Sequence, residues 1–273
     1  MLVEGVTPKA VFFALGLWAA QAFGQSVGNG SVSSIFNSRL ATSLAHADTV
    51  PISSQAISQI ADGAGWKTTM VLVNTDTVPA NYTLNFWHGD GTPLTLPTNA
   101  QGSLPQITGT IPVNGSVTIE TPGDAGGAFS QGWGQLVTSN SIGGTTIFRQ
   151  ANPGQEVSEA SVPITRPAGN VLILPFDNRT GFATSLALVN PDPATTAVVQ
   201  ITIYDQSGNV VGGGVINVPP QGQQAFALNT QFPSSAGING TVNFTSVSVP
   251  ITGLGLRFSG QVFTSVQMLA PGQ

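Results

Sequence analysis

Apolar and polar side chains alternate along two short segments of the chain, residues 65–74 and 181–190. Each segment opens with a glycine and an aromatic residue, has a large apolar side chain at alternate positions, and stops at an asparagine followed by turn-forming residues. A period of two is typical of a β-strand with one buried face, and Pro and Asp favour the turn that ends it. The repeated apolar positions are Met70 and Leu72 in the first segment and Leu186 and Leu188 in the second. The chain is therefore predicted to contain two copies of one structural unit.

The two copies stay in register beyond this strand. Residues 82–88 place Tyr82, Leu84 and Phe86 on one face, residues 198–204 repeat the pattern, and a glycine-containing turn follows each segment. Further strands are expected at residues 117–120, 135–138, 145–149, 157–162, 240–246 and 262–269. Because Gly and Pro separate these segments and none has a helical period, the pattern predicts an all-β fold of antiparallel sandwiches.

The length of 273 residues suits two domains. The repeat places them at residues 57–166 and 167–273, with a proline at their junction that limits flexing. Residues 25–56 are rich in Ser, Gly and Asn, and we interpret them as a flexible linker.

The first 24 residues have the layout of a signal peptide. Lys9 precedes an apolar run, residues 10–20, and the small residues after it suit cleavage after Ala22 or Gly24. The alternative is a membrane anchor, but the run is shorter than the about 20 residues that span a bilayer. The sequence therefore predicts export to the extracellular space or the cell surface, with no membrane span in the mature chain.

Composition narrows the possible functions. Only 7% of residues are charged, against roughly 25% in an average soluble domain, and the net charge of -5 leaves no basic stripe for nucleic acid. The chain has no cysteine, which excludes disulfides, thiolate catalysis and cysteine-ligated zinc.

These features together resemble bacterial immunoglobulin-like surface modules and, more narrowly, secreted repeat proteins of uncharacterised function. The resemblance is carried by Trp66, Leu72, Asn74 and Gly91 in the first copy and by Phe182, Leu188, Asn190 and Gly208 in the second. It covers about residues 57–270 and implies two tandem immunoglobulin-like β-sandwich domains. It also implies a role in adhesion, surface display or extracellular assembly, and no functional residue can be carried over from it.

Catalytic and metal-binding chemistry finds little support in the sequence. The two histidines, His46 and His88, lie in the linker and at a hairpin end, and Asp205 takes the place of His88 in the second copy. Most carboxylates lie in turns, where Asp caps its own backbone, and no loop has the dense acidic spacing of a calcium site. We therefore predict no enzyme activity, no catalytic residue, no cofactor and no metal site.

Aromatic side chains are the one candidate for ligand binding, because sugars stack on exposed Trp and Tyr faces. Trp66 and its partner Phe182 suit a core role. Trp87 and Tyr204 are expected on the outer face of the sheet, opposite Leu84 and Ile201, and Trp133 is not required by the shared core because Gly240 takes its place in the second copy. These three residues are the candidate carbohydrate-binding site. The alternative is that they cover sheet surface or the domain junction, which we favour because single surface aromatics are common.

The favoured function is a non-enzymatic secreted or cell-surface protein whose partners are other surface proteins or copies of itself, with glycan binding as the alternative. Between Thr180 and the C-terminus the only charged residues are Asp192, Asp205 and Arg257, so few charges protect the strand edges there. The uncharged segment 262–269 is expected to be internal to a sheet or paired between chains by strand addition to residues 50–53. The alternative is that it pairs only within its own domain.

Overall fold

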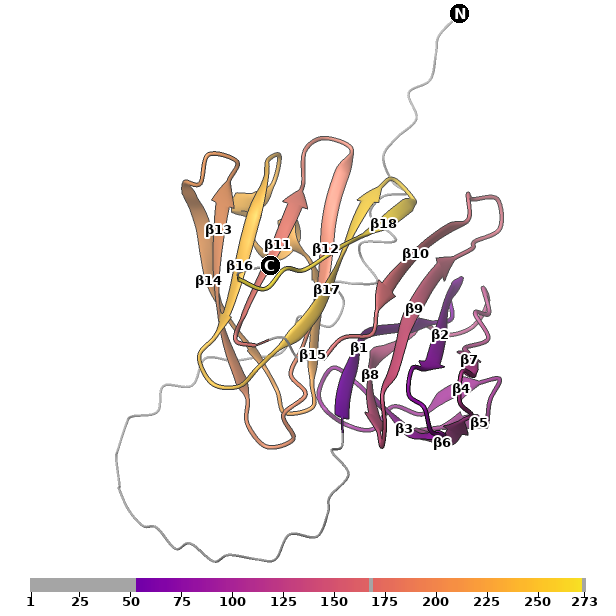
Figure 1. The fold of residues 1–273 in the computed structure, drawn as a ribbon. Helices are drawn as coiled ribbons and strands as arrows, with labels where there is room; N and C mark the ends of the chain where they lie inside the picture. The colour runs from indigo at the N-terminus through magenta and orange to yellow at the C-terminus, as the bar shows by residue number, and fades with distance from the viewer. Residues whose placement is uncertain (1–52, 167–168, 272–273) are drawn as a thin grey trace, which may run out of the picture.

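The computed structural model describes residues 53–166 and 169–271, and its strands form two groups that lie side by side (Figure 1). All sheets are antiparallel and helix is confined to two short turns, which confirms the all-β prediction. The expected signal peptide and most of the expected linker lie outside the described residues. No helix in the described part of the chain is long and apolar enough to cross a membrane.

The first repeat contains ten strands. They are β1 (Ser53–Asp62), β2 (Trp66–Asn74), β3 (Ala80–Trp87), β4 (Leu96–Thr98), β5 (Gly102–Leu104), β6 (Gln106–Ile111), β7 (Ser116–Glu120), β8 (Ser130–Thr138), β9 (Ile142–Gln150) and β10 (Ser158–Pro163). Eight of them form two four-stranded sheets, in the orders β1-β8-β3-β6 and β10-β9-β2-β7, while β4 and β5 pair with each other.

The second repeat contains eight strands and two short helical segments. They are β11 (Val171–Asp177), β12 (Phe182–Val189), β13 (Ala197–Asp205), β14 (Val210–Val218), β15 (Gln223–Ala227), α2 (Leu228–Gln231), η1 (Pro233–Ser235), β16 (Asn239–Ser246), β17 (Thr252–Ser259) and β18 (Val262–Val266). The sheet orders, β11-β16-β13-β14 and β18-β17-β12-β15, match those of the first repeat strand for strand. The sequence repeat is therefore also a repeat of topology.

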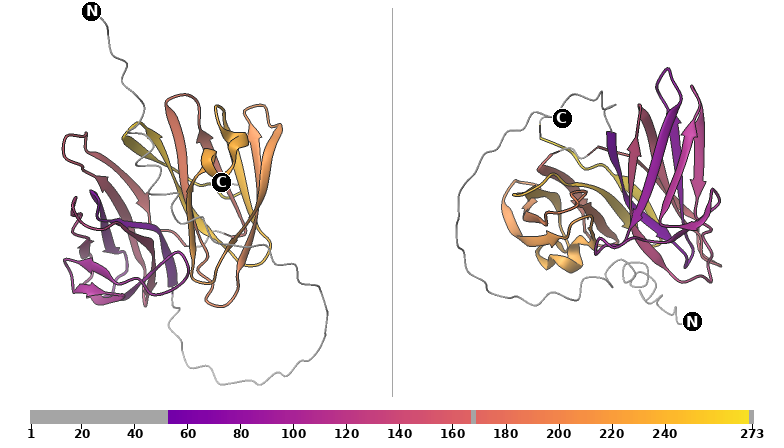
Figure 2. Two further views of the ribbon diagram at one scale, coloured as in Figure 1. Left: turned by 180° about the vertical axis from the view of Figure 1, so that it is seen from behind. Right: turned by 90° about the horizontal axis from the view of Figure 1, so that it is seen from below.

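Each repeat buries one apolar core between its two sheets, in a sandwich-like arrangement (Figure 2). Tyr82, Leu84 and Phe86 of β3 are buried in the first core together with Met70 and Leu72 of β2, as the alternation predicted. The second core contains the corresponding residues Leu186, Leu188, Val199, Ile201 and Ile203. Burial of one face of each sheet is what fixes the register of these strands.

The repeated asparagine explains why the two copies share their turns. The Asn74 side-chain amide donates hydrogen bonds to the carbonyls of Val78, Ile111 and Pro112 at 2.8, 3.0 and 3.2 Å, and its oxygen accepts the Asp76 N–H. Asn190 makes the same four bonds at the corresponding positions of the second repeat. One buried amide thus satisfies the backbone where the chain leaves the strand, and its loss would leave carbonyls without partners.

The N-terminal strand begins earlier than expected. β1 starts at Ser53, whereas the sequence pattern placed the start of the domain at residue 57. The pattern missed these first residues because Gln55 is polar and nevertheless buried. Its side-chain amide donates a hydrogen bond to the Ile142 carbonyl at 2.7 Å. At the other end, β18 stops at Val266 instead of residue 269, and Leu269 instead forms a bridge to Ile173 of β11.

Candidate functional site

The most extensive feature outside the two cores is the junction between the repeats. The outward face of the sheet that contains β12 and β17 carries apolar side chains, and these pack against the first repeat. The cluster joins Ala187, Leu254, Leu256, Phe258 and Phe263 of the second repeat to Ala61, Trp66, Phe148 and Ala160 of the first. All of these residues are less than a tenth exposed. Because a large apolar interface suppresses relative motion of domains, we expect the two repeats to move as one rigid unit.

Phe263 is the aromatic anchor of this junction. Its ring centroid lies 5.2 Å from that of Trp66 and 5.4 Å from that of Phe258. Its backbone N–H donates to Ser158 Oγ at 2.8 Å, and that hydroxyl donates to the Phe263 carbonyl at 3.3 Å. The hairpin that carries Phe263 is therefore held to the edge of β10 by both packing and hydrogen bonds.

Gln223 is the polar anchor on the opposite side of the junction. Its side-chain amide donates to the Ser58 carbonyl at 2.7 Å, to Gln59 Oε1 at 2.8 Å and to the Gly132 carbonyl at 3.0 Å. Its backbone N–H donates to the Gly89 carbonyl at 3.0 Å. A buried amide with several partners fixes the relative position of the two repeats more narrowly than apolar packing alone.

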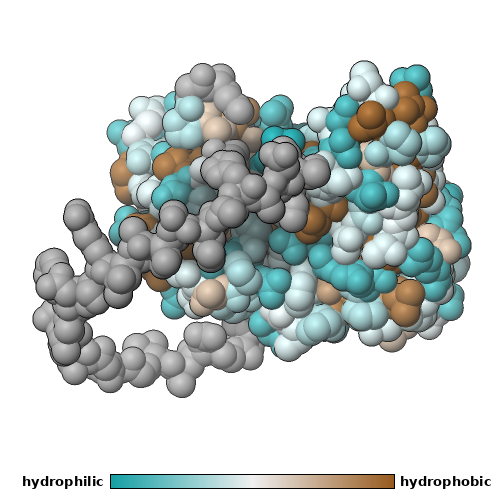
Figure 3. Space-filling model, turned by 60° about the horizontal axis from the view of Figure 1, so that its bottom comes forward, coloured by the Kyte–Doolittle hydropathy of each residue, from teal (hydrophilic) through white to brown (hydrophobic). Residues whose placement is uncertain are grey.

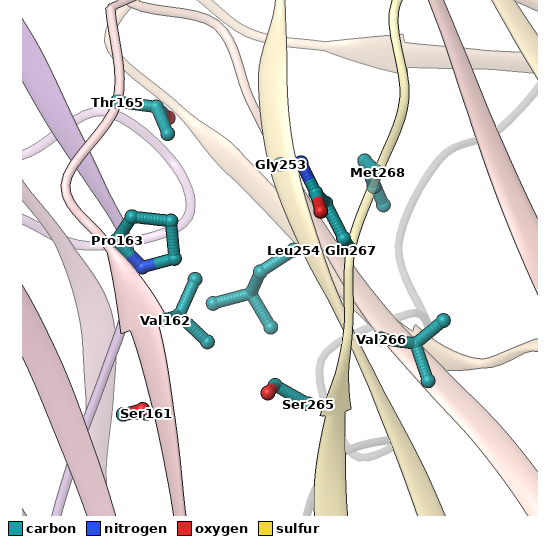
Figure 4. Close-up of a pocket in the computed structure, with 10 residues that line it drawn as sticks. All are labelled: Ser161, Val162, Pro163, Thr165, Gly253, Leu254, Ser265, Val266, Gln267 and Met268. Carbon is teal, nitrogen blue, oxygen red and sulfur yellow. The ribbon is translucent and has the colours of Figure 1, made fainter.

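A cleft of about 260 Å³ opens where β10 and β18 separate (Figure 4). Val162 and Leu254 lie next to each other at its centre, and its polar groups come from uncharged side chains such as Ser161, Thr165 and Ser265. Its volume is below the roughly 300–1,000 Å³ of ordinary ligand pockets. The cleft can accommodate a few small apolar or hydroxyl-bearing groups, and it lacks an acid or base with which to transform them.

Two of the three candidate carbohydrate-binding residues lie at the junction. Trp133 is 0% exposed, and its indole N–H donates to the Gln221 carbonyl of the second repeat at 2.8 Å. Trp87 pairs with Trp133 across β3 and β8 and packs, half-buried, on the cluster of Ala56, Trp133 and Val189. Trp133 therefore has no face on which a sugar could stack, and both tryptophans cover the domain junction.

Tyr204 lies apart from the two tryptophans, on β13 in the second repeat. It is half-buried on the outward face, with Val210 of β14 and Thr241 of β16 beside it. The structure thus does not bring the three aromatic residues together into one platform. Figure 3 shows a face of the molecule on which hydrophobic residues occur as separate small patches among polar ones.

The aspartates of the turns cap their own backbone. The Thr77 N–H lowers the pKa of Asp76, the Ala194 and Thr195 N–H groups lower that of Asp192, and bonds from Asn209 lower that of Asp205. The hydroxyl of Thr92 likewise lowers the pKa of Asp90. Among residues 53–166 and 169–271, no three Asp, Glu or His side chains lie close enough together to hold a metal ion.

His88 occupies the hairpin turn that the sequence indicated, and its backbone N–H donates to the Thr92 carbonyl at 2.8 Å. The other histidine, His46, lies outside the described residues.

Asp177 is the centre of the one compact charge cluster among the described residues. Arg179 contacts its carboxylate at 2.9 Å, and Arg257 contacts it at 3.0 Å while lying 3.7 Å above the Phe182 ring centroid. The hydrogen bonds from Arg179 hold the pKa of Asp177 well below its usual range. Both arginines are thus paired with the one carboxylate of Asp177, and the cluster closes the end of the second repeat.

Sequence reasoning missed the junction residues Gln223 and Phe263. The signal that could have indicated a junction was the outward-facing set of positions in β12, where Ala183, Ser185 and Ala187 are smaller than the residues of β2 at the same places. No protein-family model, curated protein or solved structure matches the chain.

Proposed function

We propose that this protein is a non-enzymatic secreted or cell-surface structural protein that acts in adhesion or extracellular assembly. The observation that carries the proposal is the apolar junction, which packs two sandwich-like repeats against each other. Two repeats held side by side by an apolar junction suit display or assembly, where a fixed spacing between surfaces is needed. The turn-capping and ion-paired roles of the acidic side chains support a non-enzymatic protein.

We further propose that each repeat is an immunoglobulin-like sandwich. Leaving aside β4 and β5, the second strand of the repeat pairs with the fifth (β2 with β7) and the third with the sixth (β3 with β8), as strands B, E, C and F do in that fold. The departure lies in the outer strands, because β1 pairs with β8 and β9 pairs with β2. The proposal is thus of a relative with rearranged outer strands.

Export rests on the layout of residues 1–24, which lie outside the described residues. Intact mass of the protein recovered from its native source tests it. We expect a chain that begins after Ala22 or Gly24, and a chain that retains its first 22 residues would contradict export by cleavage.

A glycan array separates the structural role from carbohydrate binding. We expect no specific signal from the wild-type chain. Specific binding that is lost in Tyr204→Ala or Trp87→Ala, while the unfolding midpoint is unchanged, would contradict the structural proposal. The stability control is needed because Trp87 packs at the junction, so a loss of binding on its own would not separate contact from misfolding.

A further inference from the structure

Edge strands carry backbone groups without a neighbour, and in the described part of the chain most edge strands have at least one contact that covers such a group. In an edge strand every second residue points its N–H and C=O away from the sheet, and those groups pair with any available strand. β1 is covered by Thr165, which exchanges two backbone bonds with Ala56. β10 and β18 face each other through Ser158 and Phe263.

Side chains and loops cover further edges. Gln101 caps β6, since its amide donates to the Thr108 carbonyl at 2.7 Å and its oxygen lies 3.5 Å from the Thr108 N–H. Asn99 caps β7 by accepting the Glu120 N–H at 2.8 Å and donating its own N–H to the Glu120 carbonyl at 3.0 Å. Leu269 exchanges two backbone bonds with Ile173 of β11. β15 is only five residues long and runs directly into α2.

β14 is the long edge that lacks such a cover. Among the described residues, no group other than those of β13 hydrogen-bonds the backbone of residues 210–217. The insertion that carries β4, β5 and Gln101 in the first repeat has no counterpart between β13 and β14. The strand has nine residues with no charge and no proline, two usual means of protecting an edge, and its irregularity in register lies at its first residues, where Val211 is skipped.

The register of the two repeats identifies which groups of β14 point outward. Thr108 of β6 pairs with Thr83, and Val215 of β14 pairs with Gln200 at the corresponding place. Since Gln101 reaches the Thr108 N–H and C=O from outside the sheet, those of Val215 point outward as well. Val215 is 61% exposed and Val210 is 64% exposed, so nothing among the described residues covers their side chains.

We propose that β14 is a strand-addition site that pairs antiparallel with β14 of a second copy of this chain, about a two-fold axis near Gly214. This inference rests on the proposed assembly function and names its site. When a strand pairs with an identical strand, any charged residue on it meets the same charge on the partner. β14 carries no charged residue, so self-pairing brings no like charges together. In this register Val215 lies opposite Gly213 of the second copy, and the two Val215 side chains are diagonal neighbours on one face.

The test is sedimentation velocity of the full-length mature chain across about two decades of concentration, where dimer formation depends on mass action. We expect a dimer for the wild type and for Thr108→Lys, and a monomer for Val215→Lys. Both lysines occupy exposed corresponding positions, so Thr108→Lys controls for the added charge. Unfolding midpoints measured at high dilution check that both variants fold.

Hydrogen exchange gives a second readout, because the Val215 amide should be protected at high concentration and exchange freely in Val215→Lys. A dimer that survives Val215→Lys would overturn the β14 site and leave the assembly function standing. A wild-type chain that remains monomeric at every concentration would overturn self-pairing. The rigid structural role is tested separately, by spin-label distances measured across the junction between the repeats.

Discussion

The two repeats share their cores but differ in what they present at the same outer positions. On the outward face of the sheet that contains β2 or β12, the first repeat carries Lys67, Thr69, Val71 and Val73, and the second carries Ala183, Ser185, Ala187 and Val189. The four residues of the second repeat are almost fully buried against the first, whereas those of the first are partly or largely exposed. A face that the core does not use thus becomes part of the joint where its side chains are smaller, since Ala183 stands in place of Lys67, Ser185 in place of Thr69 and Ala187 in place of Val71.

The ends of the repeats differ in the same way. Thr68 hydrogen-bonds Ala61 and pairs with Phe148, while the matching Thr184 hydrogen-bonds Asp177 and pairs with Arg257. In the first repeat this end is apolar and receives Phe263. In the second repeat it is closed by the ion pairs of Asp177 with Arg179 and Arg257, so the corresponding surface is charged.

The strongest test of this comparison exchanges the key residue of each end. Ala61→Asp places a carboxylate at a fully buried site. No arginine is there to pair with it, because the first repeat has Phe148 at the place where the second repeat has Arg257. We therefore expect the free energy of unfolding to fall by about 3–5 kcal/mol, or the variant to fail to fold. The reverse change, Asp177→Ala, removes a partly exposed charge network and should cost about 1–3 kcal/mol. Urea titration of both variants measures the two losses, and equal losses would contradict the distinction between the ends.

A second test compares the two aromatic residues that open β2 and β12. Trp66→Ala removes a fully buried side chain that contacts Phe263, and by analogy with other buried aromatics we expect a loss of about 3–5 kcal/mol. Phe182→Ala removes a partly exposed ring under Arg257 and should cost less than half as much. Only the first variant should split thermal unfolding into two calorimetric transitions; a split in Phe182→Ala alone would show that the junction has been misplaced.

Acid should weaken the charged end and leave the apolar end unaffected. The pKa of Asp177 is lower in the folded state than in the unfolded state. Its charge therefore stabilises the fold fully above the unfolded-state pKa of about 3.9, and this stabilisation is lost as the pH falls toward the folded-state pKa. We therefore expect the stability difference between wild type and Asp177→Asn to shrink as the pH is lowered from about 6 to about 2. A difference that stays constant over this range would show that the carboxylate charge does not stabilise the end.

The smallest expected effect concerns the joint face itself. The hydroxyl of Ser185 is buried and has no hydrogen-bond partner among the described residues, whereas Thr69 at the same position of the first repeat bonds Glu120 at 3.0 Å. Ser185→Ala should leave stability unchanged or raise it by up to about 1 kcal/mol, because an unsatisfied buried hydroxyl is removed. Thr69→Ala is the matched control and should lower stability slightly.

The sequence predicted the parts of the fold that depend on one buried face. β2, β3 and β13 alternate cleanly, and their residues fill the two cores as expected. β1 escaped prediction because both of its faces are buried and four of its buried residues, Gln55, Ser58, Gln59 and Asp62, are polar. Such a strand loses the period-two signal.

β17 shows why the junction could not be predicted from a single copy. Its large side chains, Leu254, Leu256 and Phe258, face the other repeat, while Gly253 and Gly255 face its own core. Alternation therefore indicates a buried face but does not say which body buries it. The tryptophans Trp87 and Trp133 were open to either explanation for the same reason, and their position at the junction was one of the two alternatives.

Electron spin distance measurements decide whether the two repeats form one rigid body. The chain has no cysteine, so labels can be placed at will. An exposed pair that spans the junction, Val113→Cys with Val247→Cys, is compared with a pair inside the first repeat, Val113→Cys with Val157→Cys. We predict that the distance distribution across the junction is as narrow as the one inside the repeat. A distribution several times broader across the junction would show that the repeats move independently and would contradict the account.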